Sequence, residues 1–198
     1  MNKAQFQDYW AKNFSKTPPI NHLFKQNLKE RWLRIYSLPD AKRYANTPEE
    51  WAILLERQNT LFVDLMPCDA KICIVSGIFS NENTVFEKEV FGTLPYHKTL
   101  NFKALDALDM HAVSGDWYDE GMKFTPCFAE EIYAPHKFDS ILKSIANDEW
   151  RLFFLDPKTH TIIAPYDGGV DIILGEKYPL SIFTKKYENW LSKREDGL

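Results

Sequence analysis

The sequence predicts an α+β protein with a mainly antiparallel sheet of about five or six strands, flanked by about three or four helices. A long amphipathic helix with clear start and stop signals is the first observation behind this prediction. The second is a short β-branched segment at residues 71–79, which is typical of a buried strand. The third is a run of strand-like segments near the C-terminus, separated by turns so short that neighbouring strands must pair antiparallel.

The helices are expected from the spacing of apolar residues. In the clearest one, Thr47 and Glu50 have the spacing of a capping box and Pro48 occupies the first helical position. Pro67 marks the end of this helix, because proline cannot continue a helix from its interior. The expected helices cover residues 3–14, 47–66, 138–145 and 180–191.

Strands are expected where alternating or β-branched residues are bounded by turn residues. At residues 31–38 a helix is the competing interpretation, because Leu28, Trp32 and Ile35 also share one helical face. Residues 156–159 are expected to form a type I turn, since aspartate favours its first position and proline its second. The expected strands cover residues 31–38, 71–79, 124–134, 150–155, 160–164 and 170–174.

Residues 80–121 are the least regular part of the chain and contain asparagines, glycines and a proline. A strand is expected near residues 85–91 and a short helix near residues 102–110. No internal repeat or linker divides the sequence, so residues 1–198 are expected to form a single globular domain.

Composition indicates a soluble protein of the cytoplasm. Hydrophobic residues make up 44% of the chain, enough for a core, but no apolar run approaches the about 20 residues of a membrane helix. The first ten residues also lack the apolar stretch of a secretory signal. An odd number of cysteines favours a reducing compartment, and Cys68, Cys73 and Cys127 are all expected to be buried apolar fillers.

Charge is unevenly distributed, although the net charge of −4 argues against general nucleic-acid binding. Residues 1–46 hold nine Lys or Arg and three acids, whereas residues 104–131 hold seven acids and one Lys. One interpretation is two solvated faces. The other is that the acidic stretch faces a basic partner, because complementary potentials steer association.

Residues 116–120 are the main candidate for a recognition surface. They lie in a glycine-flanked loop, and Trp and Tyr are enriched at binding hot spots, where nearby carboxylates could pair with basic side chains of a partner. The alternative is that Trp117 folds back into the core and the acids face water. The candidate partner-binding residues are Asp109, Asp116, Trp117, Tyr118, Asp119 and Glu120.

A second candidate is the turn formed by residues 166–171. Glycine lets the backbone bend there, Asp167 could bond the amides of its own turn, and Asp171 lies beside the next strand. A shaped binding loop containing Tyr166, Asp167 and Asp171 is one interpretation. The other is a hairpin joint in which Tyr166 packs on the final helix.

No motif for catalysis, a metal or a cofactor is recognisable, so none of these is expected. The histidines lack metal-site spacing, and a solvated acidic loop is favoured over a metal site at His111 and Asp116. Cys127 and His136 are a conceivable thiol–imidazole pair. Such a pair must lie within hydrogen-bond reach to act in catalysis.

The C-terminal third resembles a bacterial family of domains of unknown function. Arg34 and the segment from the 51–65 helix to the strand at Ile72 are also similar to that family, whereas residues 80–121 are not. The resemblance implies a fold class and a bacterial origin, and no reaction. The residues that carry it are 151–157 (Arg-Leu-Phe-Phe-Leu-Asp-Pro), 162–172 (Ile-Ile-Ala-Pro-Tyr-Asp-Gly-Gly-Val-Asp-Ile) and 187–192 (Tyr-Glu-Asn-Trp-Leu-Ser).

Small acidic, aromatic-rich bacterial proteins of this kind are similar to toxin-immunity proteins of contact-dependent inhibition. The first hypothesis is therefore a non-enzymatic protein that binds and neutralises a cognate toxin. The toxin is expected to be basic and to act on nucleic acid. The protein itself is expected to bind neither nucleic acid nor membranes. The second hypothesis is a small enzyme that uses Cys127, His136 or the acidic loop. A regulatory or scaffolding domain is a third, which no feature of the sequence distinguishes.

Overall fold

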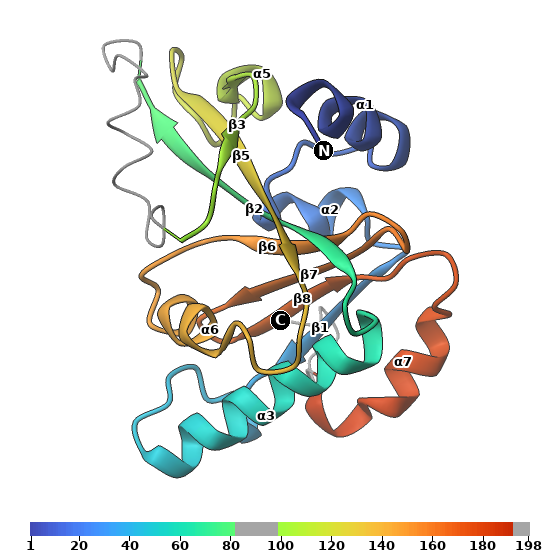
Figure 1. The fold of residues 1–198 in the computed structure, drawn as a ribbon. Helices are drawn as coiled ribbons and strands as arrows, with labels where there is room; N and C mark the ends of the chain where they lie inside the picture. Colours follow the sequence, from blue (N-terminus) through green and yellow to red (C-terminus); the bar gives the residue numbers. More distant parts are fainter. Residues whose placement is uncertain (82–98, 192–198) are drawn as a thin grey trace.

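A computed structural model of the chain describes residues 1–81 and 99–191, which form an antiparallel sheet with helices on both faces (Figure 1). Within the described residues the sheet has eight strands in the order β1-β8-β7-β6-β2-β5-β3, and β4 also pairs with β5. The sequence predicts the antiparallel character correctly but too few strands. The strands are β1 (Trp32–Tyr36), β2 (Lys71–Ser80), β3 (Lys103–Ala104), β4 (Leu108–Asp109), β5 (Lys123–Ile132), β6 (Phe153–Asp156), β7 (Thr161–Tyr166) and β8 (Gly169–Ile173).

The described residues contain more helices than the sequence predicts, because several are only about one turn long. The α-helices are α1 (Lys3–Asn13), α2 (Phe24–Asn27), α3 (Pro48–Leu65), α5 (Met110–Val113), α6 (Asp139–Ala146) and α7 (Leu180–Lys186). The described residues also contain three 3₁₀ turns: η1 (Asn21–Leu23), η2 (Pro39–Ala41) and η3 (Glu188–Trp190).

The longest helix, α3, begins where its capping residues predict. The Thr47 hydroxyl accepts a hydrogen bond from the Glu50 amide, with Pro48 in the first turn. The Glu50 carboxylate turns back to the amide of Asn46, one residue before the cap, at 2.7 Å. The first bond satisfies one of the amides that the first turn of a helix leaves without intrahelical acceptors, and the second fixes the chain just before the cap.

The two ends of the sheet are built differently. At one end, β2 and β5 pair over ten residues and the short strands β3 and β4 follow one another along the free side of β5. At the other end, β6, β7 and β8 form tight hairpins, as the turn residues predict. In the turn between β6 and β7 the Asp156 carboxylate accepts hydrogen bonds from the Lys158 amide at 2.8 Å and from the Thr159 hydroxyl at 2.8 Å. Strand β1 then pairs with β8 at the edge.

Each face of the sheet has its own hydrophobic cluster. Helices α3, α6 and α7 cover one face of the sheet: α3 and α7 lie below it in Figure 1, and α6 lies at the left, next to β7. Their apolar residues, among them Phe62, Ile145 and Phe183, pack on alternate strand residues such as Ile74 and Ile172. Because side chains alternate along a strand, the residues between these positions point to the other face.

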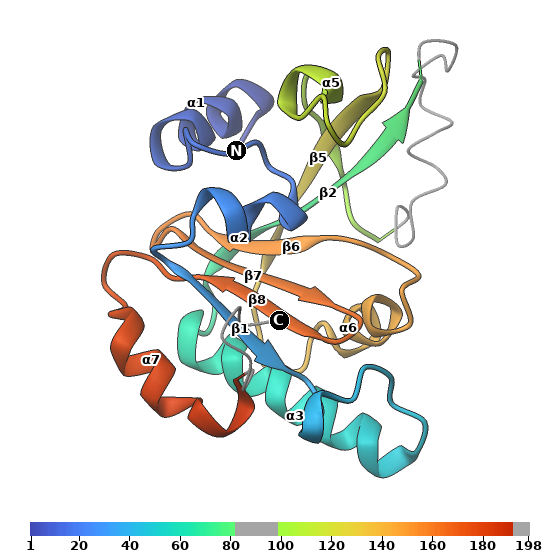
Figure 2. The ribbon, with the colours of Figure 1, turned by 180° about the vertical axis from the view of Figure 1, so that it is seen from behind.

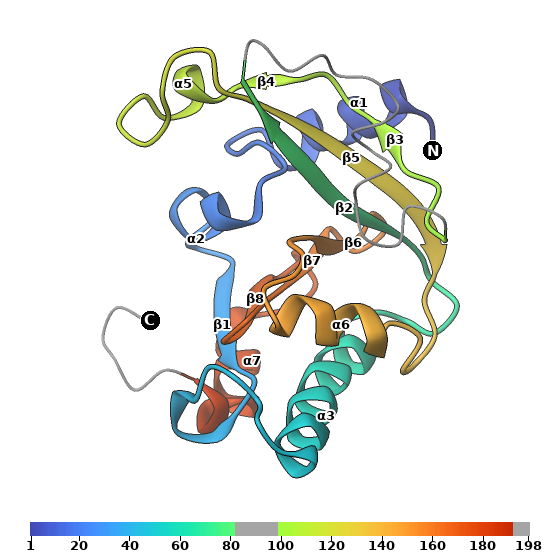
Figure 3. The same cartoon turned by 90° about the vertical axis from the view of Figure 1, so that its left-hand side faces the viewer.

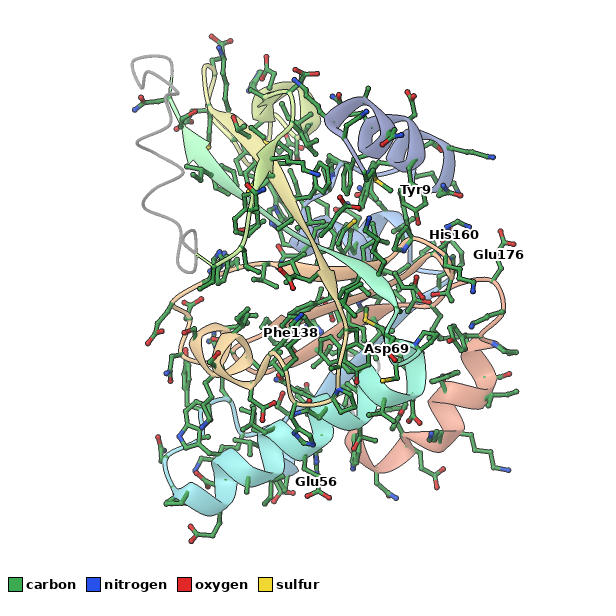
Figure 4. The ribbon with its side chains drawn as sticks, in the orientation of Figure 1. Tyr9, Glu56, Asp69, Phe138, His160 and Glu176 are labelled. Carbon is green, nitrogen blue, oxygen red and sulfur yellow. The ribbon has the colours of Figure 1, made fainter. Side chains whose placement is uncertain are left out.

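The other face is covered by α1 and α2, as seen from behind in Figure 2. Phe6 stacks on Phe128 of β5 at 4.4 Å between ring centroids, and Trp10 stacks on Phe14 at 4.6 Å. At the end of this layer the Tyr9 hydroxyl and His160 Nδ1 are 2.9 Å apart, and both residues are labelled in Figure 4. The contact ties α1 to the turn between β6 and β7.

Several sequence predictions are wrong in detail. Residues 102–110 are not a helix: they form β3 and β4, and α5 begins only at Met110. The expected helix at 180–191 ends at Lys186 and is followed by η3, and β6 begins at Phe153, three residues later than expected. Cys68 is exposed, whereas Cys73 and Cys127 are buried as predicted. The strand expected near residues 85–91 lies outside the described residues.

Across residues 1–81 and 99–191, no helix combines the length and the apolar character that a membrane crossing requires.

Candidate functional site

An ion pair between Arg34 and Asp171 lies on the face of the sheet that carries α1 and α2. The two residues are directly opposite each other in β1 and β8. Arg34 Nε lies 2.7 Å from Asp171 Oδ1 and Nη2 lies 2.8 Å from Oδ2, so the pair is bidentate. Their side chains are only 17% and 10% exposed. A parallel pair of charge-assisted bonds fixes both side chains in one geometry.

Aromatic rings surround this pair. The Arg34 guanidinium lies 4.8 Å from the ring centre of Tyr166 and 5.4 Å from that of Trp32. Burial alone would lower the pKa of Arg34, but its bonds to Asp171 and the neighbouring acidic groups outweigh this and raise it. Burial also raises the pKa of Tyr166 above its ordinary value. Arg34 is therefore a permanent cation and Tyr166 a neutral hydroxyl.

The hairpin between β7 and β8 holds a second ion pair beside the first. The Asp167 carboxylate, 7% exposed, accepts from Arg43 Nε and, at 3.0 Å, from the Tyr44 hydroxyl. Gly169 is required at this hairpin, because a Cβ atom there would lie 2.2 Å from the Ile35 carbonyl oxygen. Glycine thus permits the close approach of β8 to β1 that brings Arg34 to Asp171.

These residues line a cleft of about 200 Å³. The segment between α6 and β6 forms its opposite wall, where Arg151 Nη2 lies 3.5 Å from Asp148 Oδ1. We call this site the arginine cleft. Its lining residues are Asn21, His22, Arg34, Arg43, Ile145, Asp148, Trp150, Arg151, Ala164, Tyr166, Asp167 and Asp171.

A second hollow of about 350 Å³ lies beside the arginine cleft. The two share one wall, made of Asn21, His22, Asp148, Trp150 and Arg151. The floor of the second hollow is largely apolar and lies where β2 continues beyond its pairing with β6. We call it the apolar hollow. Its apolar lining residues include Ile20, Val75, Phe79, Phe124 and Phe153.

The predicted recognition loop follows α5 and projects from the upper part of the molecule in Figure 1. We call residues 109–120, which are the cap of α5, α5 itself and the loop after it, the acidic loop. Trp117 is 65% exposed, so it does not fold back into the core, and Asp116, Asp119 and Glu120 are exposed as well. Asp109 instead caps α5 by accepting from the Ala112 amide at 3.2 Å.

The acidic loop borders the apolar hollow through Tyr118. The Tyr118 hydroxyl is hydrogen-bonded to His22 Nε2, and its ring stacks on Phe79 at 6.0 Å between centroids. His22 also lines the arginine cleft. In Figure 3 the loop after α5 and helix α2 lie on the same side of the molecule. The two candidate regions that the sequence left as alternatives are therefore parts of one continuous surface.

Sequence reasoning found only part of the arginine cleft. It singled out Tyr166, Asp167 and Asp171 from the glycine-containing turn, but it missed Arg43 and Arg151. The packing alternative for Tyr166 is wrong, because its ring lies by Arg34, on the face opposite the final helix. Asp167 likewise bonds side chains of a neighbouring segment, whereas the sequence suggested the amides of its own turn.

The pair of Cys127 and His136 is not supported. Cys127 is fully buried in β5, and burial raises the pKa of its thiol to about 12. His136 lies beyond the end of the same strand with a side chain 68% exposed, and its ring contacts Asp139 at 3.4 Å. A reactive cysteine needs an accessible thiol with a lowered pKa, and Cys127 has neither property.

A third hollow, of about 710 Å³, lies at the opposite end of the sheet. Its central carboxylate is Glu130, which pairs with the Met1 ammonium at 2.5 Å, Lys71 at 3.0 Å and Lys103 at 3.1 Å. These groups join the N-terminus to three strands and satisfy one another, so we regard this region as structural.

The comparison with protein families gives one match over most of the chain. The model of a family described as a domain of unknown function, DUF3885, matches residues 20–195. The chain belongs to the DUF3885 family. The match to DUF3885 includes every residue that lines the arginine cleft and the whole acidic loop, whereas α1 lies outside it. The searches of curated proteins and of solved structures found no match to this chain.

Proposed function

We propose that this DUF3885 protein is a non-enzymatic binding protein whose acidic loop docks on a basic partner protein. The partner class that we propose is the toxin of a contact-dependent inhibition system, which the protein would neutralise by covering its basic surface. The exposed Trp117 among three exposed carboxylates is the observation that carries this proposal.

Trp117 is the most exposed of the large hydrophobic side chains in the described residues, at 65%. Tryptophan is enriched at binding hot spots because it removes a large apolar area from water when a partner covers it. Phe79, 47% exposed, extends the same apolar patch through its contact with Tyr118. Exposed aromatic area of this kind is typical of interaction surfaces.

The seven carboxylates of residues 104–131 fall into three groups, one of which is Asp109 alone, the cap of α5. Asp106, Glu130 and Glu131 pair with lysines of the chain itself. By contrast, within residues 1–81 and 99–191 no ion pair involves Asp116, Asp119 or Glu120. The acidity available to a partner is therefore concentrated around Trp117.

This arrangement suits a two-step association. Exposed carboxylates attract a basic surface over a distance of about 8–10 Å at moderate ionic strength, which raises the rate of encounter. Burial of Trp117 and contact with the apolar hollow would then slow dissociation, since most affinity differences between related complexes lie in the dissociation rate. No chemical step is required, which agrees with the burial of Cys127 and the exposure of His136.

A site-specific photo-crosslink tests this proposal. A photoreactive phenylalanine analogue replaces Trp117 in the protein expressed in its own host, and the complex is purified at low salt. The same analogue at Ile182, which is 60% exposed on α7, is the matched control. We expect one basic protein to be crosslinked at position 117 and identified by mass spectrometry, with a yield that falls at high salt.

Equal crosslinking from positions 117 and 182, or a partner of acidic composition, would contradict the proposed surface. A specific basic partner without antibacterial activity of its own would retain the binding role and exclude the toxin.

A further inference from the structure

We propose that the arginine cleft is a binding site for a small oxyanion, namely the phosphate or carboxylate group of a free small molecule. The inference is independent of the acidic loop. It rests on two observations. Three guanidinium groups line one cleft, and few of their N–H donors already donate hydrogen bonds within the protein.

The donors of the cleft outnumber its acceptors. Arg34 uses Nε and Nη2 for Asp171, and Arg43 uses Nε for Asp167. In the described part of the chain, Nη1 of Arg34 and both terminal nitrogens of Arg43 have no hydrogen-bond acceptor. Each guanidinium carries five N–H donors in a planar fork, so most of the donors in the cleft remain available.

Arg151 is the most available of the three. Its side chain is 74% exposed, and its contact with Asp148 is 3.5 Å long, well beyond an ordinary charge-assisted bond. An incoming oxyanion can therefore replace Asp148 as the acceptor at little cost. Arg43 is similarly accessible, with a side chain 63% exposed.

The acceptors of the cleft are largely used by its own arginines. Both oxygens of Asp171 accept from Arg34, and Oδ2 of Asp167 accepts from both Arg43 and Tyr44. These carboxylates hold Arg34 and Arg43 in place and are poor partners for an incoming cation. A ligand rich in hydrogen-bond acceptors fits a cleft with unused donors and few unused acceptors, and a guanidinium or ammonium ligand does not.

The ligand must be small and must bind through directed hydrogen bonds. The three arginines and three aspartates of the cleft balance in formal charge, so a general positive field does not select the anion. The volume of about 200 Å³ is below the range of about 300–1,000 Å³ that holds a whole cofactor. It suits a phosphate or carboxylate group, whose paired oxygens match the guanidinium fork.

The test is a titration of the whole protein with inorganic phosphate, and separately with acetate, followed by ¹H–¹⁵N NMR at constant ionic strength. We expect saturable shifts of the amides around Ala164, Asp167 and Arg151. The variants R43A and R151A should each weaken binding about tenfold, because one charge-assisted hydrogen bond contributes about that factor. Arg151 is exposed and its contact with Asp148 is long, so R151A should leave the fold intact. R43A leaves the buried Asp167 carboxylate with only the Tyr44 hydroxyl, so urea denaturation of this variant accompanies its titration.

The control is K12A, which removes the same charge from an exposed position on α1. Its affinity for either anion should equal that of the unaltered protein. Saturable binding of phosphate alone assigns a phosphate-bearing ligand, and saturable binding of acetate alone assigns a carboxylate-bearing one. Shifts that never saturate with either anion would overturn the proposal, as would an equal loss of affinity in K12A and R151A.

Discussion

The largely buried pair of Arg34 and Asp171 is a tightly constrained charged contact on the face of the sheet that carries α1 and α2. Both oxygens of the carboxylate are engaged, and the guanidinium lies against two aromatic rings. Removing one member of such a pair leaves the other charge without its partner in a place that water reaches poorly. A substitution of one member should therefore lower the free energy of unfolding by more than the intact pair contributes to it.

Asp171→Ala should lower the free energy of unfolding by about 3 kcal/mol, since Arg34 then remains largely buried without a carboxylate. Adding Arg34→Met should recover part of this loss, because the uncompensated charge is gone and the apolar stem is kept. Urea denaturation of the three proteins measures both effects. A double variant less stable than the single one would contradict this account.

Sequence reasoning found Asp171 but not its role. The glycines of the turn drew attention to residues 166–171, because turn chemistry is local in the chain. The partner of Asp171 is Arg34, 137 positions away, and only the pairing of β1 with β8 brings the two together. The place of Arg43 and Arg151 in the cleft is even harder to predict from the sequence, because both lie in irregular segments on opposite walls of the cleft.

At the scale of elements, local signals predicted most of the hairpins and the long helix. The prediction failed at residues 102–110, where a short helix was expected. In the structure Leu105 packs in the cluster under α1, and Met110 packs in a separate small cluster with Phe124. The segment is held extended by pairing with β5, and that tertiary contact outweighs its local preference.

The carboxylate of Glu130 joins three strands to the N-terminus. Its bond to the Met1 ammonium, with those to Lys71 and Lys103, lowers the pKa of Glu130 to about 2 despite partial burial. A folded-state pKa below the unfolded value near 4.5 means that the stabilisation is present above about pH 4.5. It is lost as the pH falls from there towards 2.

Glu130→Gln should therefore lower the free energy of unfolding at pH 7 by about 1 kcal/mol, the upper end for solvent-accessible ion pairs. It should also flatten the fall in stability between about pH 4.5 and pH 2. Thermal unfolding monitored across this range tests both effects. Glu56→Gln, at an exposed position that points away from the sheet in Figure 4, is the control and should change neither quantity. If the stability of Glu130→Gln fell with pH in parallel with that of the unaltered protein, Glu130 would not be the source of this pH dependence.

At the scale of the whole molecule, the acidic loop and the arginine cleft lie on one surface with the apolar hollow between them. His22 links them, because it contacts Tyr118 and lines both the arginine cleft and the apolar hollow. No local pattern in the sequence could show this, since it depends on η1, the loop after α5 and the segment before β6 meeting in space. A partner on the acidic loop could therefore cover the cleft, and an anion in the cleft could influence that partner.

The central claim is that the acidic loop steers a basic partner to this surface. The direct test is the association rate of the partner identified by crosslinking with a triple charge reversal, Asp116→Lys, Asp119→Lys and Glu120→Lys. The control is the triple reversal Asp8→Lys, Glu56→Lys and Glu188→Lys, which changes the net charge equally at exposed positions on α1, α3 and η3.

At low ionic strength we expect the acidic-loop variant to associate at least about tenfold more slowly than the unaltered protein, with a difference that shrinks as salt is added. The control should slow association much less, because its charges lie away from the interface. Equal rates for the two variants would mean that only net charge matters, and an unchanged rate for the acidic-loop variant would contradict the claim.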